Sequence, residues 1–167
     1  MKILVVSDSH GRDENLEQAV MQETPFDMLI HCGDVEGREI FIEAFTECPC
    51  HIVSGNNDFF SDLPREEIIE VGNNRIFVTH GHYYGVSMDV SGVVDEARDR
   101  GCNIALFGHT HKPFLEDIDG ILTLNPGSLT YPRQRGRRPS YAVLEMDEKG
   151  KMTAEIRYLE NQVDTTQ

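Results

Sequence analysis

The chain has 167 residues, of which 39% are hydrophobic, and this length suits one domain that buries an apolar core without disulfides or a structural metal. Its 29 Asp and Glu residues outnumber its 15 Lys and Arg residues, which gives a net charge of −14. That charge repels polyanions, so it argues against broad electrostatic binding to long nucleic acid or to an anionic membrane. A solvated acidic surface is the simplest explanation of the charge.

The first half of the chain alternates continuous apolar runs with helical patterns. The apolar runs predict strands over 2–7, 26–31 and 50–54, each buried on both faces. Apolar residues three or four positions apart predict helices over 13–22 and 38–46. The order β-α-β-α-β indicates an α/β fold.

The second half is richer in strands. We expect strands over 75–79, 103–107 and 121–124, a helix over 88–100, and a closing antiparallel hairpin of 141–146 with 153–159. These patterns predict mixed sheets with a helical cover, and they leave open whether there is one sheet or two packed sheets. We expect a single domain over 1–160, followed by a polar tail over 161–167.

The cysteines and the opening residues predict a cytoplasmic protein. The four cysteines fall in or beside predicted strands and helices, as reduced thiols would. Cys48-Pro49-Cys50 is a poor match to a zinc-finger or redox motif. The apolar opening, Met1 to Val6, is too short for a signal sequence or a membrane-spanning helix.

Five polar fragments stand where apolar runs end, and they carry the chemistry of the chain. They are Asp8-Ser9-His10, Gly33-Asp34, Gly55-Asn56-Asn57-Asp58, Thr79-His80-Gly81-His82 and Gly108-His109-Thr110-His111. Each fragment alone is typical of a turn, a helix cap or a surface histidine. Ligands of α/β proteins gather at the carboxyl ends of strands, so the joint occurrence of all five favours a site for two divalent metals.

The order and spacing of these fragments resemble the calcineurin-like metallophosphoesterase superfamily, whose pattern is DxH, GDxxD, GNH[DE], a histidine and GHxH. The resemblance extends from Met1 to about Tyr131 and includes the loop Asn125-Pro126-Gly127-Ser128. Small single-domain phosphodiesterases of that group, close in fold to the retromer component Vps29, look most similar. The resemblance implies a four-layer sandwich of two mixed β-sheets flanked by helices.

The resemblance also implies a set of metal ligands. One metal would be held by Asp8, His10, Asp34 and His111, and the other by Asp34, Asn56, His80 and His109, with Asp34 bridging them. Manganese is the metal we expect first, with nickel, iron and zinc as alternatives. The implied activity is hydrolysis of small phosphodiesters by a hydroxide that bridges the two metals.

Two positions depart from the superfamily pattern. Gly37 replaces the second Asp of GDxxD, which weakens support around a ligand without removing one. Asn57 replaces the histidine of GNH[DE] that usually protonates the leaving oxygen, whereas Asp58 matches the last position of the motif. Asparagine cannot deliver a proton, so the leaving group is a good one, or His82 or a water supplies the proton, or turnover is slow.

Several alternatives remain open at this point. A Vps29-like module that binds a partner protein is the main rival to an enzyme, and a phosphomonoesterase or nucleotidase is the second. The basic run Arg133–Arg138 either gathers a small phosphate-ester substrate or lies in solvent or in a homo-oligomer contact. Three tyrosines are candidates for stacking on a base or for packing: Tyr83, Tyr84 and Tyr131. His31 and His51 are expected to be structural.

Overall fold

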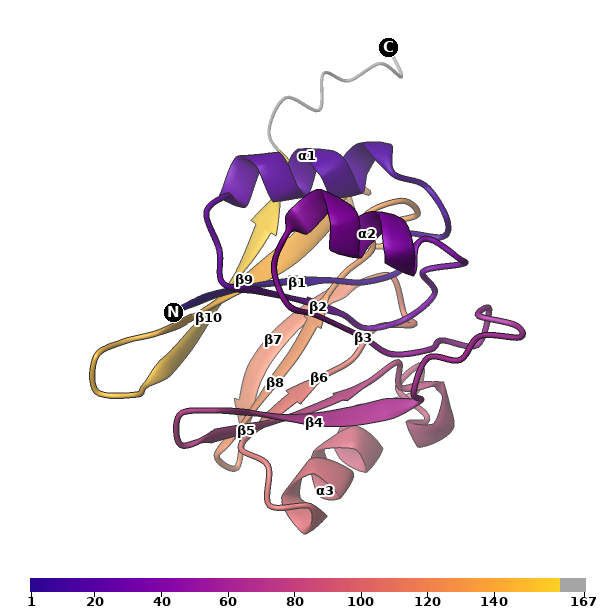
Figure 1. The fold of residues 1–167 in the computed structure, drawn as a ribbon. Helices are drawn as coiled ribbons and strands as arrows, with labels where there is room; N and C mark the ends of the chain where they lie inside the picture. Colours follow the sequence, from indigo (N-terminus) through magenta and orange to yellow (C-terminus); the bar gives the residue numbers. More distant parts are fainter. Residues whose placement is uncertain (160–167) are drawn as a thin grey trace.

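The computed structural model describes residues 1–159, and it contains two five-stranded β-sheets packed face to face (Figure 1). In spatial order, the first sheet contains β10 (Met152–Tyr158), β9 (Ser140–Met146), β1 (Lys2–Val6), β2 (Met28–His31) and β3 (Cys50–Ile52). The second contains β4 (Glu66–Val71), β5 (Asn74–Thr79), β6 (Ile104–Leu106), β8 (Ile121–Pro126) and β7 (Pro113–Ile118). The tail expected over 161–167 lies outside the described residues.

In the part of the chain that the structure describes, three α-helices cover the outer faces of the sheets. Helices α1 (Glu14–Glu23) and α2 (Glu39–Thr46) lie over the first sheet, and α3 (Ser91–Asp99) lies over the second (Figure 1). The molecule therefore has four layers, which confirms the sandwich of two mixed sheets implied by the resemblance. Within residues 1–159, no helix is long and apolar enough to cross a membrane.

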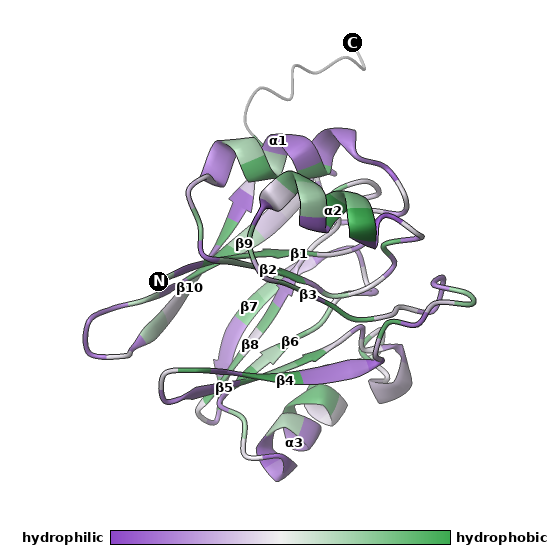
Figure 2. Ribbon diagram, viewed as in Figure 1, coloured by the Kyte–Doolittle hydropathy of each residue, from purple (hydrophilic) through white to green (hydrophobic). Residues whose placement is uncertain are grey.

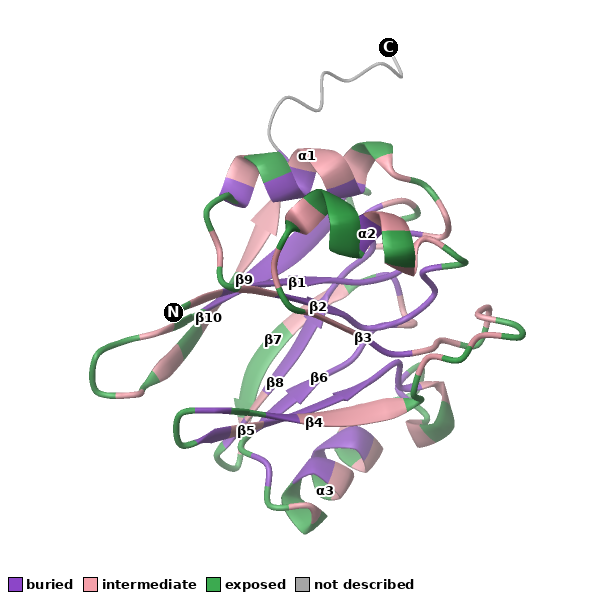
Figure 3. Ribbon diagram, viewed as in Figure 1, coloured by how far each residue is buried: buried purple, intermediate pink, exposed green. Residues whose placement is uncertain are grey.

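The alternation of side chains along each strand explains the layers. In β1, Ile3 and Val5 join the core between the sheets, whereas Leu4 and Val6 pack beneath α1 and α2. In β5, Phe77 points away from the core between the sheets, toward α3. The central strands are both apolar and buried (Figures 2 and 3), as the continuous apolar runs predict.

The parallel pairs of strands determine where the loops gather. In the first sheet β1, β2 and β3 run parallel, and in the second β5, β6 and β8 do so. The remaining pairs are antiparallel, so both sheets are mixed. The loops that leave β1, β2, β3, β5 and β6 at their carboxyl ends contain the five polar fragments.

The largest differences from the sequence predictions are two strands and the start of one helix. The sequence did not predict β4 and β7, because both are edge strands with charged, solvent-facing residues instead of an apolar run. The helix expected from Met88 begins at Ser91 instead. The carboxylate of Asp89 accepts hydrogen bonds from the backbone N–H and the hydroxyl of Ser91, which stabilises the turn before α3.

Candidate metal centre

Loops from both sheets bring the seven predicted metal ligands to one end of the sandwich. The loop after β1 carries Asp8 and His10, that after β2 carries Asp34, that after β3 carries Asn56, that after β5 carries His80, and that after β6 carries His109 and His111. Contacts between these side chains join all seven into one cluster. The sequence alone could place each of them only in its own loop.

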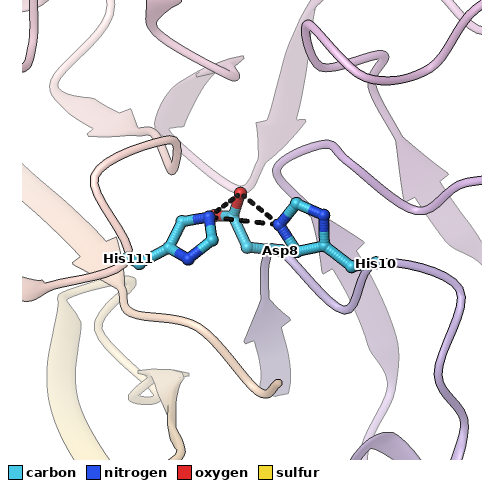
Figure 4. Close-up of side chains that lie close together, drawn as sticks. All are labelled: Asp8, His10 and His111. Atoms are coloured by element: carbon cyan, nitrogen blue, oxygen red, sulfur yellow. Dashed lines mark hydrogen bonds and ion pairs between the residues drawn. The ribbon is translucent and has the colours of Figure 1, made fainter. Parts of the chain in front are cut away.

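Asp8, His10 and His111 form the first group of potential ligands (Figure 4). One carboxylate oxygen of Asp8, Oδ1, lies 3.3 Å from Nε2 of His111 and 3.7 Å from Nε2 of His10. The two Nε2 atoms are 3.1 Å apart. Two imidazoles and a carboxylate therefore direct ligand atoms toward one another from loops about a hundred residues apart in the sequence.

Asp8, Asp34 and His80 form the second group. Nε2 of His80 lies 3.4 Å from Oδ2 of Asp34 and 3.8 Å from Oδ1 of Asp8. Oδ2 of Asp34 is also 3.9 Å from Nε2 of His10, which belongs to the first group. Both carboxylates thus lie between the two groups, where a bridging ligand would have to lie.

Asn56 and His109 extend the second group. Oδ1 of Asn56 lies 3.1 Å from Nδ1 of His109. The ring of His109 is in turn 5.1 Å from that of His80, in an edge-on arrangement. The structure therefore places these two residues beside His80, on the side where the resemblance places the second metal.

The orientation of the imidazoles is determined by backbone carbonyls. Nδ1 of His80 donates to the carbonyl oxygen of Cys32 at 2.7 Å, and Nδ1 of His111 donates to that of Tyr131 at 2.7 Å. In its neutral form, each ring therefore presents an unprotonated Nε2 to the cluster. Histidines that bind metals are commonly held in this way, because the second hydrogen bond selects the tautomer.

Two buried atoms at the centre of the cluster lack hydrogen-bond partners within residues 1–159, and they indicate what the cluster can hold. They are Oδ1 of Asp8 and Nε2 of His80. The other oxygen of Asp8 is satisfied, since it accepts from the Ser7 hydroxyl at 2.7 Å and the His109 N–H at 3.1 Å. A buried acceptor without a partner is costly, so carboxylate and imidazole atoms arranged in this way fit a divalent cation such as Mn, Fe, Ni or Zn.

The backbone of the cluster is strained. Among the described residues other than glycine, ten have a positive φ, and half of them are predicted ligands: Asp8, His10, Asp34, His109 and His111. Their φ angles lie between 51° and 72°, a region that L-residues rarely occupy. Strain of this kind is concentrated at functional sites, where the surrounding structure enforces it.

Two glycines allow the loops to approach one another closely. A Cβ atom at Gly55 would overlap the carboxylate of Asp34, and one at Gly108 would lie 2.8 Å from Oδ2 of Asp8. Neither carboxylate could keep its position beside a larger residue. The glycines of the Gly55-Asn56 and Gly108-His109 fragments therefore do more than form turns.

The two carboxylates remain ionised despite their burial. Burial alone would raise the pKa of Asp8, but its interactions with His10 and His111 hold that pKa far below the usual range. Burial likewise would raise the pKa of Asp34, and the interaction with His80 lowers it. The cluster thus contains two negative charges near neutral pH, as a cation site requires.

Asn57 and Asp58 support the loop of Asp34. Asn57 donates its backbone N–H to Oδ1 of Asp34 at 2.9 Å and its side-chain amide to Oδ2 at 3.0 Å. The carboxylate of Asp58 accepts the backbone N–H groups of Asp34, Glu36 and Gly55 at 2.7–2.8 Å. Asp58 therefore holds the Asp34 and Asn56 loops together.

His82 lies at the edge of the cluster, in a short 3₁₀ helix, η1 (His82–Tyr84). Its ring is 5.3 Å from that of His80 and 6.0 Å from that of His109. Burial lowers the pKa of His82, and the neighbouring His80 lowers it further, so the ring is neutral at neutral pH. Its Nδ1 atom is buried and has no hydrogen-bond partner in the described part of the chain.

The three tyrosines considered for stacking fall into two classes. Tyr84 packs edge-on against Phe77 and donates its hydroxyl to Glu66, so it is a packing residue. Tyr83 and Tyr131 are exposed, and their rings contact those of His82 and His10, respectively. The stacking interpretation therefore remains open for Tyr83 and Tyr131 only.

His31 connects two ligand loops, a role that the sequence did not reveal. Its Nδ1 accepts the N–H of Gly33 at 3.1 Å, so its proton lies on Nε2, which donates to the hydroxyl of Ser9 at 2.9 Å. Gly33 precedes Asp34, and Ser9 lies between Asp8 and His10. The neutral ring thus orients both loops, which agrees with the structural role expected for it but makes that role specific to the site.

The burial of His31 predicts a loss of stability in acid. Burial lowers its pKa from 6.5 to about 4, so between these values the unfolded chain binds a proton that the folded chain refuses. The free energy of unfolding therefore decreases as the pH is lowered through this window, by about 3 kcal/mol at its lower end. In metal-free protein, His31→Asn should lose less unfolding free energy than the wild type between pH 7 and pH 4.5, as measured by urea denaturation. Equal losses in both proteins would contradict this.

A comparison with known proteins identifies the family. The family model described as "Calcineurin-like phosphoesterase superfamily domain" matches residues 1–149. The chain belongs to this superfamily. The resemblance stated from the five polar fragments is thereby confirmed.

Members of the superfamily with related sequences carry enzymatic names. The probable metallophosphoesterase YsnB of Bacillus subtilis is 39% identical over 150 residues, which cover 88% of this chain and 85% of that protein. Phosphodiesterase MJ0936 of Methanocaldococcus jannaschii is 31% identical over 147 residues, covering 76% of this chain and 83% of that protein. The superfamily and these relatives support a phosphoesterase.

The fold is shared with Vps29 proteins as well. The crystal structure of wild-type Vps29 of Entamoeba histolytica complexed with zinc superposes with a TM-score of 0.75, covering 96% of this chain and all of that one. The two sequences are 23% identical, so this likeness concerns the fold alone. One architecture thus occurs in proteins named for phosphoester chemistry and in proteins named for vacuolar protein sorting.

Proposed function

We propose that the chain is a phosphodiesterase that acts on small substrates with two divalent cations. Asp8, His10, Asp34 and His111 would hold one cation, and Asp34, Asn56, His80 and His109 would hold the other. The observation that carries this proposal is the pair of buried, unpartnered acceptors, Oδ1 of Asp8 and Nε2 of His80, at the centre of the cluster. No hydrogen bond within the described chain satisfies them, whereas cations would.

Charge makes the site suitable for a phosphate ester. Two divalent cations would supply a charge of +4, an activated water nucleophile and neutralisation of the phosphoryl oxygens. Asp8 and Asp34 return −2, so the centre stays positive although the chain carries −14. A small diester can reach such a centre, whereas a long polyanion would be repelled by the acidic surface.

Asn57 determines which substrates suit the site. It occupies the motif position of the histidine that usually protonates the leaving oxygen. Its side-chain amide has no acidic proton, and its N–H already donates a hydrogen bond to Asp34. We assign the proton for the leaving oxygen to His82, whose Nδ1 has no hydrogen-bond partner among the residues that the structure describes. Since the pKa of His82 is lowered, the protonated ring is scarce at neutral pH, and substrates with good leaving groups should react fastest.

Metal removal and replacement test the proposed function. Purified protein should lose activity on an aryl phosphodiester after chelation and regain it when manganese is added, with lower activity on the matching monoester. Higher activity on the monoester would indicate a phosphomonoesterase or nucleotidase. Absence of metal-restored turnover on both substrates would contradict an enzymatic role.

An interaction module of the Vps29 type is the second candidate. It is favoured by the shared fold and by the absence of an acid at Asn57. A module without activity would be free to lose its ligands, whereas all seven predicted ligand types are present and converge here. We therefore prefer the enzyme.

We also propose a cytoplasmic location, because all four cysteines are unpaired.

A further inference from the structure

An apolar cavity of about 620 Å³ lies beside the candidate metal centre, on the outer face of the second sheet. Its walls come from the loop between η1 and α3, from the loop after β6 and from the start of β7. Phe107 and Phe114 contribute aromatic walls, with ring centroids 6.2 Å apart, and Val86 and Val90 contribute aliphatic ones. A volume of this size with mostly apolar walls is typical of small-molecule sites.

The loops that form the cavity are those that carry the imidazoles. Thr110, which lines the cavity, stands between His109 and His111. Val86 also lines it and packs against Gly81, the residue between His80 and His82, where an added Cβ would lie 3.0 Å from both of its methyl groups. A substrate whose phosphate lies at the cluster could therefore extend one arm into the cavity.

Two basic side chains that line the cavity have no acidic partner among the described residues. Lys112 and Arg133 are exposed, and neither forms an ion pair with a carboxylate in the part of the chain that the structure describes. Arg133 is also tied to the ligand loop, because its backbone N–H donates to the carbonyl of His111 at 2.9 Å. In a chain with a charge of −14, unpaired cations beside a site match an anionic ligand.

Two carboxylates, Asp89 and Glu116, also line the cavity, so an anionic group is favoured only close to Lys112 and Arg133. Asp89 is engaged by the backbone N–H and hydroxyl of Ser91, at the turn before α3. Glu116 is exposed and lies on β7, an edge strand. Apolar walls with unpaired cations suit a ligand that is partly apolar and partly anionic.

We propose that this cavity holds the nucleoside arm of a phosphodiester, with the base against the aromatic and aliphatic walls and with Lys112 and Arg133 attracting the phosphate. The assignment rests on the proposed phosphodiesterase function and names its substrate class. The flat face of a base packs well on aromatic walls, whereas a methyl arm would leave the cavity empty. The enzyme should therefore have a higher kcat/KM for nucleoside diesters than for methyl diesters.

Blocking the cavity tests the inference. Ser87 lines the cavity and is exposed, so Ser87→Trp should fill the space without disturbing the core. Activity is measured with manganese on thymidine 5′-(p-nitrophenyl) phosphate and on methyl p-nitrophenyl phosphate, which share a leaving group. We expect Ser87→Trp to lower about tenfold the ratio of kcat/KM for the thymidine substrate to kcat/KM for the methyl substrate. The change should come from a higher KM for the thymidine substrate.

A neighbouring residue provides the matched control. Met88 is 89% exposed and does not line the cavity, so Met88→Trp adds the same side chain outside it and should leave the ratio unchanged. Lys112→Ala should raise KM for both substrates about threefold, whereas Lys149→Ala, on the β9–β10 turn, should not. Circular dichroism checks that each variant is folded.

The outcomes separate this inference from the proposed function. If the wild type hydrolyses neither substrate with manganese, the phosphodiesterase function fails and the substrate assignment fails with it. If the wild type hydrolyses both substrates and Ser87→Trp leaves their ratio unchanged, the nucleoside cavity is wrong while the enzyme stands. An equal loss in Ser87→Trp and Met88→Trp would also overturn the cavity assignment.

Discussion

Asp34→Asn is expected to reduce phosphodiester turnover by about a thousandfold and to halve or empty the metal content. The substitution keeps the shape of the side chain and removes its charge. Oδ2 of Asp34 lies 3.4 Å from Nε2 of His80 and 3.9 Å from Nε2 of His10, so it faces both groups of potential ligands. An amide there would be a poorer ligand for both cations. Steady-state kinetics and elemental analysis of the purified variant measure the two effects.

A surface carboxylate provides the control for this substitution. Asp95 lies on α3 and pairs with Arg98 on the same helix, away from the cluster. Asp95→Asn removes the same charge and should leave metal content and turnover unchanged. Normal metal content together with normal turnover in Asp34→Asn would show that this carboxylate is not a ligand.

Asn57→His is expected to raise the hydrolysis of an alkyl phosphodiester about 10- to 100-fold, because it restores an acid at the motif position where the amide stands. Hydrolysis of an aryl diester should change little, since an aryl oxide leaves without a proton. The backbone N–H of residue 57 would still donate to Oδ1 of Asp34, so the loop should keep its shape. The ratio of kcat on the two diesters, measured with manganese, reports the effect.

Asn57→Gln separates protonation from packing at this position. Glutamine changes the side chain without supplying a proton, so it should not accelerate the alkyl substrate. In the natural chain, we assign this proton to His82. If Asn57→His leaves the ratio of alkyl to aryl turnover unchanged, proton transfer to the leaving group does not limit the reaction.

The sequence predicted the central strands and the ligand loops because both depend on local patterns, whereas the four layers were implied only by the resemblance to the superfamily. Continuous apolar runs such as that of Ile3 to Val6 can only be buried on both faces, and polar residues directly after them must lie at strand ends. The glycines before Asp34, Asn56 and His109 marked the turns. Recognition of the superfamily followed from the order of these fragments and is confirmed by the family match.

Other features depend on contacts between distant segments, which no local pattern reveals. The edge strand β7 has exposed charged residues, so it lacks the apolar run of a central strand. His31 contacts Ser9 across 22 positions, and Asp58 accepts the N–H of Asp34 across 24. The cavity beside Thr110 likewise forms only when the loops after β5 and β6 meet the start of β7. These contacts convert a list of candidate ligands into a spatial site.

Anomalous scattering from a crystal soaked in manganese would locate the two proposed metals. Two anomalous peaks per chain are expected, one among Asp8, His10 and His111 and the other beside Asp34 and His80. No peak at these side chains, or peaks only at surface carboxylates elsewhere, would contradict the proposed site.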